Sequence, residues 1–231
     1  MTSAEPAAVS AGLRRQREVL EEQVAAGEHH CGWKVGFGSA AGLVALGLDG
    51  PIIGHLLASG EVADGSVQVV TGWTRPVIEA EIACWIAKEV PAELDPADAD
   101  HFVGGVGPAL EVADVDHAPE DPERILAGNI FHRGYVLGRP DPRLTLTGAA
   151  ALSARFRHGE EELYVTEPEE LTGLLPQVLA RAAHLAPELG RPVLAGDVIL
   201  LGSIISPRPV RSGERVEYTL AGFPPLSLSF R

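Results

Sequence analysis

From Cys31 to the C-terminus, short apolar runs are separated by glycine, proline and aspartate, and this pattern restricts the fold more than any other feature. Each run has about the length of one β-strand, and the residues between the runs are typical of turns. The runs are GWKVGF, SVQVV, PVIEAEIACWIA, GPALEVADV, GYVLG, DVILLGSI, RVEYTL and LSLSF. Because they do not alternate regularly with helical patterns, a doubly wound parallel sheet is disfavoured. We expect a mixed α/β fold rich in strands.

Two segments have the apolar periodicity of helices. The first covers residues 13–24, where leucine and valine recur at near-helical spacing among charged residues. The second begins at Thr166, which we predict to be an N-cap residue because Glu169 follows three positions later, as in a capping box. We expect Pro187 and Gly190 to end this second helix.

The chain shows no internal repeat, low-complexity tract or long polar linker that would separate two domains. Its composition, with 45% hydrophobic and 22% charged residues, is that of an ordinary globular protein. We therefore expect residues 1–30 to form an N-terminal helical segment and residues 31–231 to form a single domain.

Charge and cysteine content exclude several classes of partner. Asp and Glu outnumber Lys and Arg by 32 to 18, which gives a formal net charge of −14 and a surface that repels nucleic acid and anionic lipid. The N-terminus has no apolar signal region, and no stretch is long and apolar enough to predict a membrane span. Cys31 and Cys84 have no metal-binding or disulfide spacing. We expect a cytoplasmic protein.

Three glutamates form the main candidate site. In the strand predicted from PVIEAEIACWIA, Glu79 and Glu81 point to one face, because side chains alternate along a strand. Their Cβ atoms are expected to lie within about 7 Å of each other, a separation that one cation can bridge. Glu111 alternates with apolar neighbours in GPALEVADV, which predicts a second strand. Three carboxylates on two strands can converge.

An all-oxygen set of ligands suits Mg²⁺ or Mn²⁺, whereas zinc favours histidine and cysteine. The alternative is that Glu79 and Glu81 lie on the solvated face of an edge strand, which the spacing alone favours. The context supports the metal site, since no basic residue occurs between Val77 and Ala87. Solvated strand faces usually carry both signs of charge.

The chain resembles the fumarylacetoacetate-hydrolase superfamily, in particular its branch of 2-keto-4-pentenoate hydratases and 4-oxalocrotonate decarboxylases. The resemblance extends from about Gln23 to Phe230 and depends on six landmarks in the family's order. They are GWKVGF, LGLDGPIIGHLL, RPVIEAEIACWI, GPALEVAD, GYVLG and GDVILLGSI. The resemblance implies a mixed β-roll core of the fumarylacetoacetate-hydrolase C-terminal-domain type with flanking helices. It also implies that Glu79, Glu81 and Glu111 bind the metal and that Lys34 reaches into the site.

One segment departs from the family pattern. Relatives often carry ADNASSGG where this chain has AGNIFHRG, so that Asn129 is kept while two small polar residues become Phe131 and His132. We expect Asn129, Phe131, Ser203 and Lys34 to contact the substrate. His132 is expected to be either a proton-transfer group or a bulky pocket wall, and Lys34 to orient the substrate or to relay a proton.

Together with the three glutamates, the resemblance implies a divalent-metal-dependent lyase, a hydratase or decarboxylase of aromatic catabolism, that acts on a small 2-oxo (2-hydroxydienoic) acid through an enolate. A homo-oligomer is expected from the resemblance. The alternative is a family member without catalysis that serves as a binding or assembly subunit, because AGNIFHRG is altered. A third possibility is a biosynthetic isomerase or lyase that acts on a larger keto compound.

Overall fold

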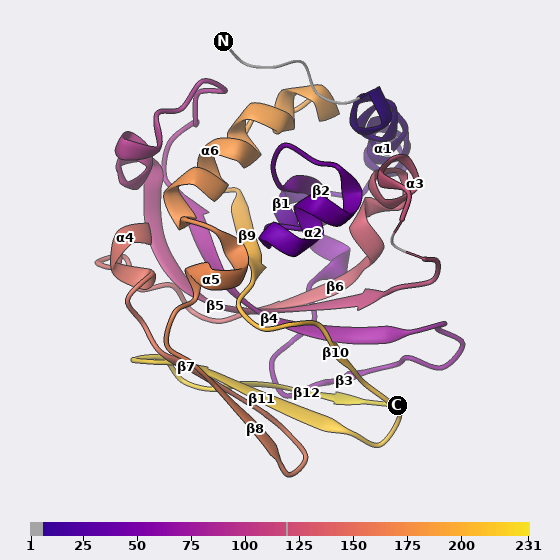
Figure 1. The fold of residues 1–231 in the computed structure, drawn as a ribbon, viewed down its shortest axis with the longest axis vertical. Helices are drawn as coiled ribbons and strands as arrows, with labels where there is room; N and C mark the ends of the chain where they lie inside the picture. The colour runs from indigo at the N-terminus through magenta and orange to yellow at the C-terminus, as the bar shows by residue number, and fades with distance from the viewer. Residues whose placement is uncertain (1–6, 119) are drawn as a thin grey trace.

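The computed structural model describes residues 7–118 and 120–231. A seven-stranded sheet curls around the site, and a five-stranded sheet packs beside it (Figure 1). The first sheet has the order β2 (Ile52–Leu57), β1 (His30–Gly36), β9 (Val198–Ser203), β4 (Pro76–Ile86), β5 (Val103–Asp114) and β6 (His132–Leu137), with β10 (Arg208–Pro209) paired to β4. The second has the order β3 (Val67–Gln68), β12 (Leu226–Phe230), β11 (Arg215–Leu220), β7 (Ala154–His158) and β8 (Glu161–Val165).

The helices cover one side of the curled sheet (Figure 1). The α-helices are α1 (Ala7–Ala25), α2 (Ala40–Leu46), α3 (Pro122–Ala127), α4 (Leu146–Ala149), α5 (Glu169–Thr172) and α6 (Leu175–Leu185). Four short 3₁₀ turns accompany them: η1 (Ala58–Gly60), η2 (Pro96–Phe102), η3 (Asn129–Phe131) and η4 (Ala186–Leu189). Within the described ranges, every helix is too short or too polar to cross a membrane.

The curled sheet closes almost completely on itself. Glu61, which follows η1, forms a parallel bridge with Tyr135 of β6, and Val62 donates a backbone hydrogen bond of 2.8 Å to the Tyr135 carbonyl. Side chains from the curled strands form a separate buried cluster: Leu56, Ala83, Ala109, Tyr135, Val198 and Leu200, with Cys31 packed against them. Because this cluster draws on all six long strands, it fills the inside of the curl.

The main hydrophobic core joins the curled sheet to the helices and to the second sheet. It contains Leu13 of α1, Ile82 of β4, Leu179 of α6 and Tyr218 of β11. The N-terminal helix is thus part of the same core as both sheets. Successive side chains of β4 point to opposite faces of the sheet, so that Ile82 belongs to this core and Ala83 to the cluster inside the curl.

The predicted strands recur in the structure with adjusted limits. Of the run SVQVV only Val67–Gln68 is a strand, and the hairpin of β7 and β8 was not expected. Helix α2 was also not expected. It begins after Ser39, whose hydroxyl accepts a hydrogen bond of 3.1 Å from the Gly42 amide.

The second predicted helix is divided in two, and its predicted N-cap is wrong. Helix α5 follows Pro168 without a side-chain cap, and Gly173 (φ 78°) separates it from α6. Glu169 instead accepts a hydrogen bond of 2.8 Å from the Leu175 amide, at the start of α6. The predicted end is confirmed, because η4 contains Pro187 and stops at the left-handed Gly190.

Candidate metal centre and substrate cavity

The structure brings the three predicted glutamates together on the inner face of the curl. The register of β4 and β5 places Glu79 opposite Glu111, and Glu81 is the next inward residue along β4. One carboxylate oxygen of each lies within 4.8 Å of the others. Among the residues that the structure describes, this is the one group of three or more potential metal ligands.

The triad is buried and carries excess negative charge. Glu81 and Glu111 have no exposed surface, and Glu79 is partly exposed towards a cavity. Burial and the neighbouring carboxylate of Glu111 raise the pKa of Glu79 to about 7, and the same causes raise the pKa of Glu81 well above its ordinary value. Three carboxylates beside one buried ammonium, that of Lys34, require a further positive charge or added protons.

Lys34 is also buried, and its ammonium joins the triad to the next segment of the cavity wall. Its Nζ lies 3.0 Å from Glu111 Oε1 and donates a hydrogen bond of 3.2 Å to the Ile130 carbonyl. Burial alone would lower the pKa of Lys34, but the carboxylates of Glu111, Glu79 and Glu81 raise it above its ordinary value. Lys34 therefore carries a positive charge in this site.

His132 binds to the triad and lies outside the cavity lining. Its Nδ1 lies 2.7 Å from Glu111 Oε1, the same oxygen that Lys34 approaches. Burial raises the pKa of Glu111, but the Lys34 charge and the His132 hydrogen bond outweigh it and hold this pKa below its ordinary value. The structure thus places His132 as a partner of Glu111, and its role as a proton-transfer group or a pocket wall stays a prediction.

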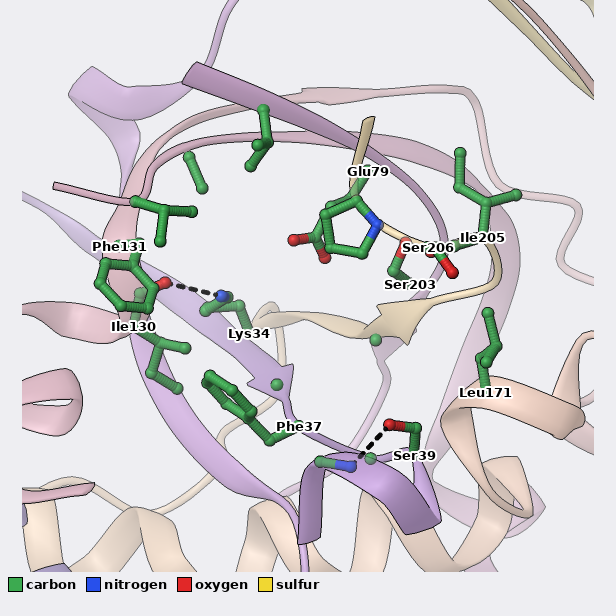
Figure 2. A pocket seen from close by; sticks show the side chains of 18 of the residues that line it. Lys34, Phe37, Ser39, Glu79, Ile130, Phe131, Leu171, Ser203, Ile205 and Ser206 are labelled. Carbon is green, nitrogen blue, oxygen red and sulfur yellow. Dashed lines mark hydrogen bonds between the residues drawn. The ribbon is translucent and has the colours of Figure 1, made fainter. Parts of the chain in front are cut away.

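A cavity of about 490 Å³ opens above Glu79 and Lys34 (Figure 2). Its walls are mostly apolar and come from β1, β4, β5, η3, α5 and the segment after β9. The main apolar lining residues are Phe37, Val77, Val115, Ile130, Phe131, Leu171, Ile205, Pro207 and Pro209. Figure 2 shows the Phe131 and Phe37 rings on one side and Ser203, Ser206 and Ile205 on the other.

Three of the four residues expected to bind substrate line this cavity, Lys34 among them, and one does not. Phe131 and Ser203 are in its wall, and the Ser203 hydroxyl donates a hydrogen bond of 2.7 Å to the Ile205 carbonyl. Asn129 is outside the lining, since its amide is bonded to Gln16 and to the backbone of His55. The amide of Asn129 is thus held by protein groups, and its contact with a substrate stays a prediction.

Arg75 is a cavity residue that the sequence interpretation missed. It precedes β4, and its backbone amide donates a hydrogen bond of 2.7 Å to Asp114. Arg75 is an exposed residue, and its side chain makes no ion pair with the described residues. The sequence offered a way to find it, because side chains alternate along a strand and Arg75, four residues before Glu79, is expected on the same face.

The residues present fit a hard divalent cation. Glu81 Oε1 and Glu111 Oε2 are buried and have no hydrogen-bond partner among the described residues. Glu81 Oε2 and Glu111 Oε1 are each already bonded, to the Gly202 amide and to Lys34 and His132 respectively. The free oxygens, with those of Glu79, are the donors that Mg²⁺ or Mn²⁺ prefers.

A curled mixed sheet with three inward carboxylates beneath an apolar cavity defines the fold class of this chain. Within that class, the chain belongs to the fumarylacetoacetate (FAA) hydrolase C-terminal family, which matches residues 52–230. The expected mixed α/β fold of the fumarylacetoacetate-hydrolase type is confirmed.

Similar proteins include hydratases and decarboxylases. The chain is 27% identical over 210 residues to 2-keto-4-pentenoate hydratase 2 of Dechloromonas aromatica (strain RCB), which covers 90% of this chain and 80% of that protein. It is 26% identical over 217 residues to a 4-oxalocrotonate decarboxylase of Pseudomonas sp, covering 93% and 84%. The solved 4-oxalocrotonate decarboxylase of Pseudomonas putida G7, complexed with magnesium and adipate, superposes with a TM-score of 0.84 at 25% identity and covers 94% of this chain and 83% of that one.

Proposed function

We propose that this chain is a divalent-metal-dependent lyase of the hydratase or decarboxylase type that acts on a small 2-oxo (2-hydroxydienoic) acid. The observation that carries the proposal is the convergence of Glu79, Glu81 and Glu111 at the inner end of an apolar cavity. The names of its relatives support the same chemistry. An open cavity beside the triad favours an enzyme over a binding or assembly subunit.

Glu79, Glu81 and Glu111 would hold the metal through the oxygens that the protein leaves without partners. When bound, Mg²⁺ or Mn²⁺ supplies Lewis-acid stabilisation of the negative charge that develops on the 2-oxo group. Lys34 and His132 hold the other oxygen of Glu111 and so fix the orientation of this carboxylate.

Lys34 binds and orients the substrate. Its ammonium has three N–H donors, of which one faces Glu111 and one bonds to the Ile130 carbonyl, so that the third is free to meet a substrate carboxylate. The raised pKa keeps Lys34 protonated, which favours orientation of an anion over abstraction of a proton.

The apolar walls select the rest of the substrate and exclude water from the reacting carbon atoms. Phe37, Ile130 and Phe131 line the site on one side, and Leu171 and Ile205 line it on the other (Figure 2). A cavity of about 490 Å³ accepts a substrate with an apolar substituent as well as a short dienoate.

Arg75 supports a second candidate within the same reaction class, the decarboxylation of a 2-oxo diacid. Arg75 lines the same cavity as Glu79, and its side chain makes no ion pair with the described residues. A planar guanidinium can bind a second carboxylate with two parallel hydrogen bonds. A hydratase acting on a monocarboxylate has no need of this charge.

A steady-state assay tests the proposal. Purified protein is incubated with 2-hydroxypenta-2,4-dienoate or with an unsaturated 2-oxo diacid, with Mg²⁺, with Mn²⁺ and after exhaustive EDTA treatment. We expect turnover of at least one substrate that depends on the metal. Full activity after EDTA treatment contradicts the proposal, and tight metal binding without turnover of either substrate supports a larger keto compound instead.

A further inference from the structure

Three consecutive residues beside the cavity adopt a backbone conformation that L-amino acids avoid. Asn129, Ile130 and Phe131 have φ values of 54°, 51° and 63°, in the left-handed region. Phe37, also a cavity residue, is the one other non-glycine residue with positive φ among those described. Such a conformation is unfavourable for each residue, above all for β-branched Ile130, so the surrounding structure must impose it.

The side chain of Asn129 fastens this left-handed turn to two other elements. Its Oδ1 accepts hydrogen bonds of 2.8 Å from Gln16 Nε2 on α1 and from the His55 amide on β2. Its Nδ2 donates a hydrogen bond of 3.0 Å to the His55 carbonyl. Gln16 is fully buried. Burial of an amide side chain lowers the stability of the folded protein unless hydrogen bonds compensate for the lost water, so the bond to Asn129 matters at this position.

The turn delivers three groups to the proposed site. The Ile130 carbonyl accepts the hydrogen bond from Lys34 Nζ, and the Ile130 and Phe131 side chains form one cavity wall (Figure 2). With ordinary right-handed or extended dihedral angles, the chain would take another path, and the carbonyl would no longer face Lys34.

We infer that Asn129 and Gln16 are positioning residues that hold the left-handed turn 129–131. The turn places the Ile130 carbonyl to orient Lys34, and it places the Ile130 and Phe131 side chains in the cavity wall for a 2-oxo acid. The inference rests on the proposed function. It also makes α1, which precedes the residues matched by the family, a working part of the site through Gln16.

The test compares variants by their affinity for pyruvate, a small 2-oxo acid, in Mn²⁺-loaded protein, with Mn²⁺ affinity, turnover and Tm measured in parallel. Gln16→Met keeps an unbranched side chain of similar length but removes the donor to Asn129. Asn129→Ala removes all three hydrogen bonds and leaves a residue that avoids positive φ, whereas Asn129→Gly removes them but tolerates it. Arg17→Ala, on the exposed face of α1, is the control.

We expect Gln16→Met and Asn129→Ala to weaken pyruvate binding by about 10-fold, as for lost supporting contacts, with Mn²⁺ affinity and the Arg17→Ala control unchanged. Asn129→Gly should bind pyruvate more tightly than Asn129→Ala and have a higher Tm.

Unchanged pyruvate affinity in folded Gln16→Met and Asn129→Ala would overturn the inference. Equal losses in the Gly and Ala variants, together with unchanged affinity in Gln16→Met, would also overturn it, because they would make Asn129 a direct ligand. If Gln16→Met does not fold, the Asn129 pair decides alone. Wild-type protein that binds pyruvate but turns over no 2-oxo acid refutes the proposed function and leaves this comparison intact.

Discussion

Phe131 and His132 are neighbours in the chain, yet their side chains have different surroundings. Phe131 lines the cavity, whereas His132 lies 2.7 Å from Glu111. Both residues were recognised in the sequence as departures from the family pattern. Their separation could not be predicted, because it depends on the left-handed turn before β6, a conformation that non-glycine residues rarely adopt.

Phe131→Ser should change substrate preference without changing metal affinity. The variant removes a large apolar wall, so kcat/KM for a 2-oxo acid with an apolar substituent should fall by about 10-fold relative to the short dienoate. Paired kinetics on the two substrates, with a Mn²⁺ titration, measure this. An unchanged ratio of kcat/KM values would remove Phe131 from the specificity wall.

His132→Ala should instead weaken metal binding. The variant removes a partner of Glu111, and the loss of such supporting contacts typically reduces metal affinity by about 10-fold or more. Calorimetric titration with Mn²⁺ measures the change. If turnover disappears on every substrate while metal affinity stays the same, His132 is a proton-transfer group.

Arg75→Leu separates the two candidate reactions. The variant removes the free guanidinium and keeps an apolar wall, so kcat/KM for a diacid should fall by about 10-fold or more, while the short monocarboxylic dienoate should be little affected. The kinetics of both substrates give the result. Equal effects on the two acids would argue that Arg75 does not bind a second carboxylate.

At the scale of elements, β1 and β2 contain two histidines that fold in the neutral form. Burial, the Arg191 charge and His29 lower the pKa of His30 to about 4, and burial with His30 and His132 lowers that of His55 to about 3. In the unfolded chain, each of these histidines takes up a proton below the ordinary histidine pKa of about 6.5. Their contribution to stability is therefore full above about pH 6.5 and is lost progressively as the pH falls towards 4 and then 3.

His55→Gln isolates this effect, because the glutamates of the site are present in both proteins. The free energy of unfolding of the wild type, measured relative to the variant by urea denaturation, should be lower at pH 5 than at pH 7.5. The sign follows from the unfolded state binding more protons in this range. A difference that is independent of pH would show that His55 titrates alike in both states.

Local sequence patterns predicted the strands better than the helices. The period-two alternation in β4 and β5 correctly placed the three glutamates on one face, since burial on both sides fixes the register. The prediction of Thr166 as an N-cap was wrong, because Gly173 divides the helix and Glu169 caps its second half. The local spacing of residues shows neither feature. The hydrogen-bond partners of Asn129 could not be predicted, because Gln16 and His55 are distant from it in sequence.

For the whole molecule, the curl of the first sheet explains how a chain with net charge −14 buries three carboxylates at one point. The strands fix the positions of these side chains, and Lys34 offsets only part of their charge. The homo-oligomer expected from the resemblance stays a prediction, and light scattering after gel filtration tests it. The sequence could not show the near-closure of the sheet, which depends on the pairing of Glu61 with Tyr135.

Calorimetric titration of the metal-free protein with Mn²⁺ tests the proposed metal centre directly. We predict about one site per chain in the wild type and in Glu160→Gln, an exposed control. Affinity should be at least about 10-fold weaker in Glu81→Gln, which loses a ligand charge while nearly keeping the shape of the side chain. No binding by the wild type, or an unchanged titration in Glu81→Gln, would contradict the assignment of the three glutamates as the metal centre.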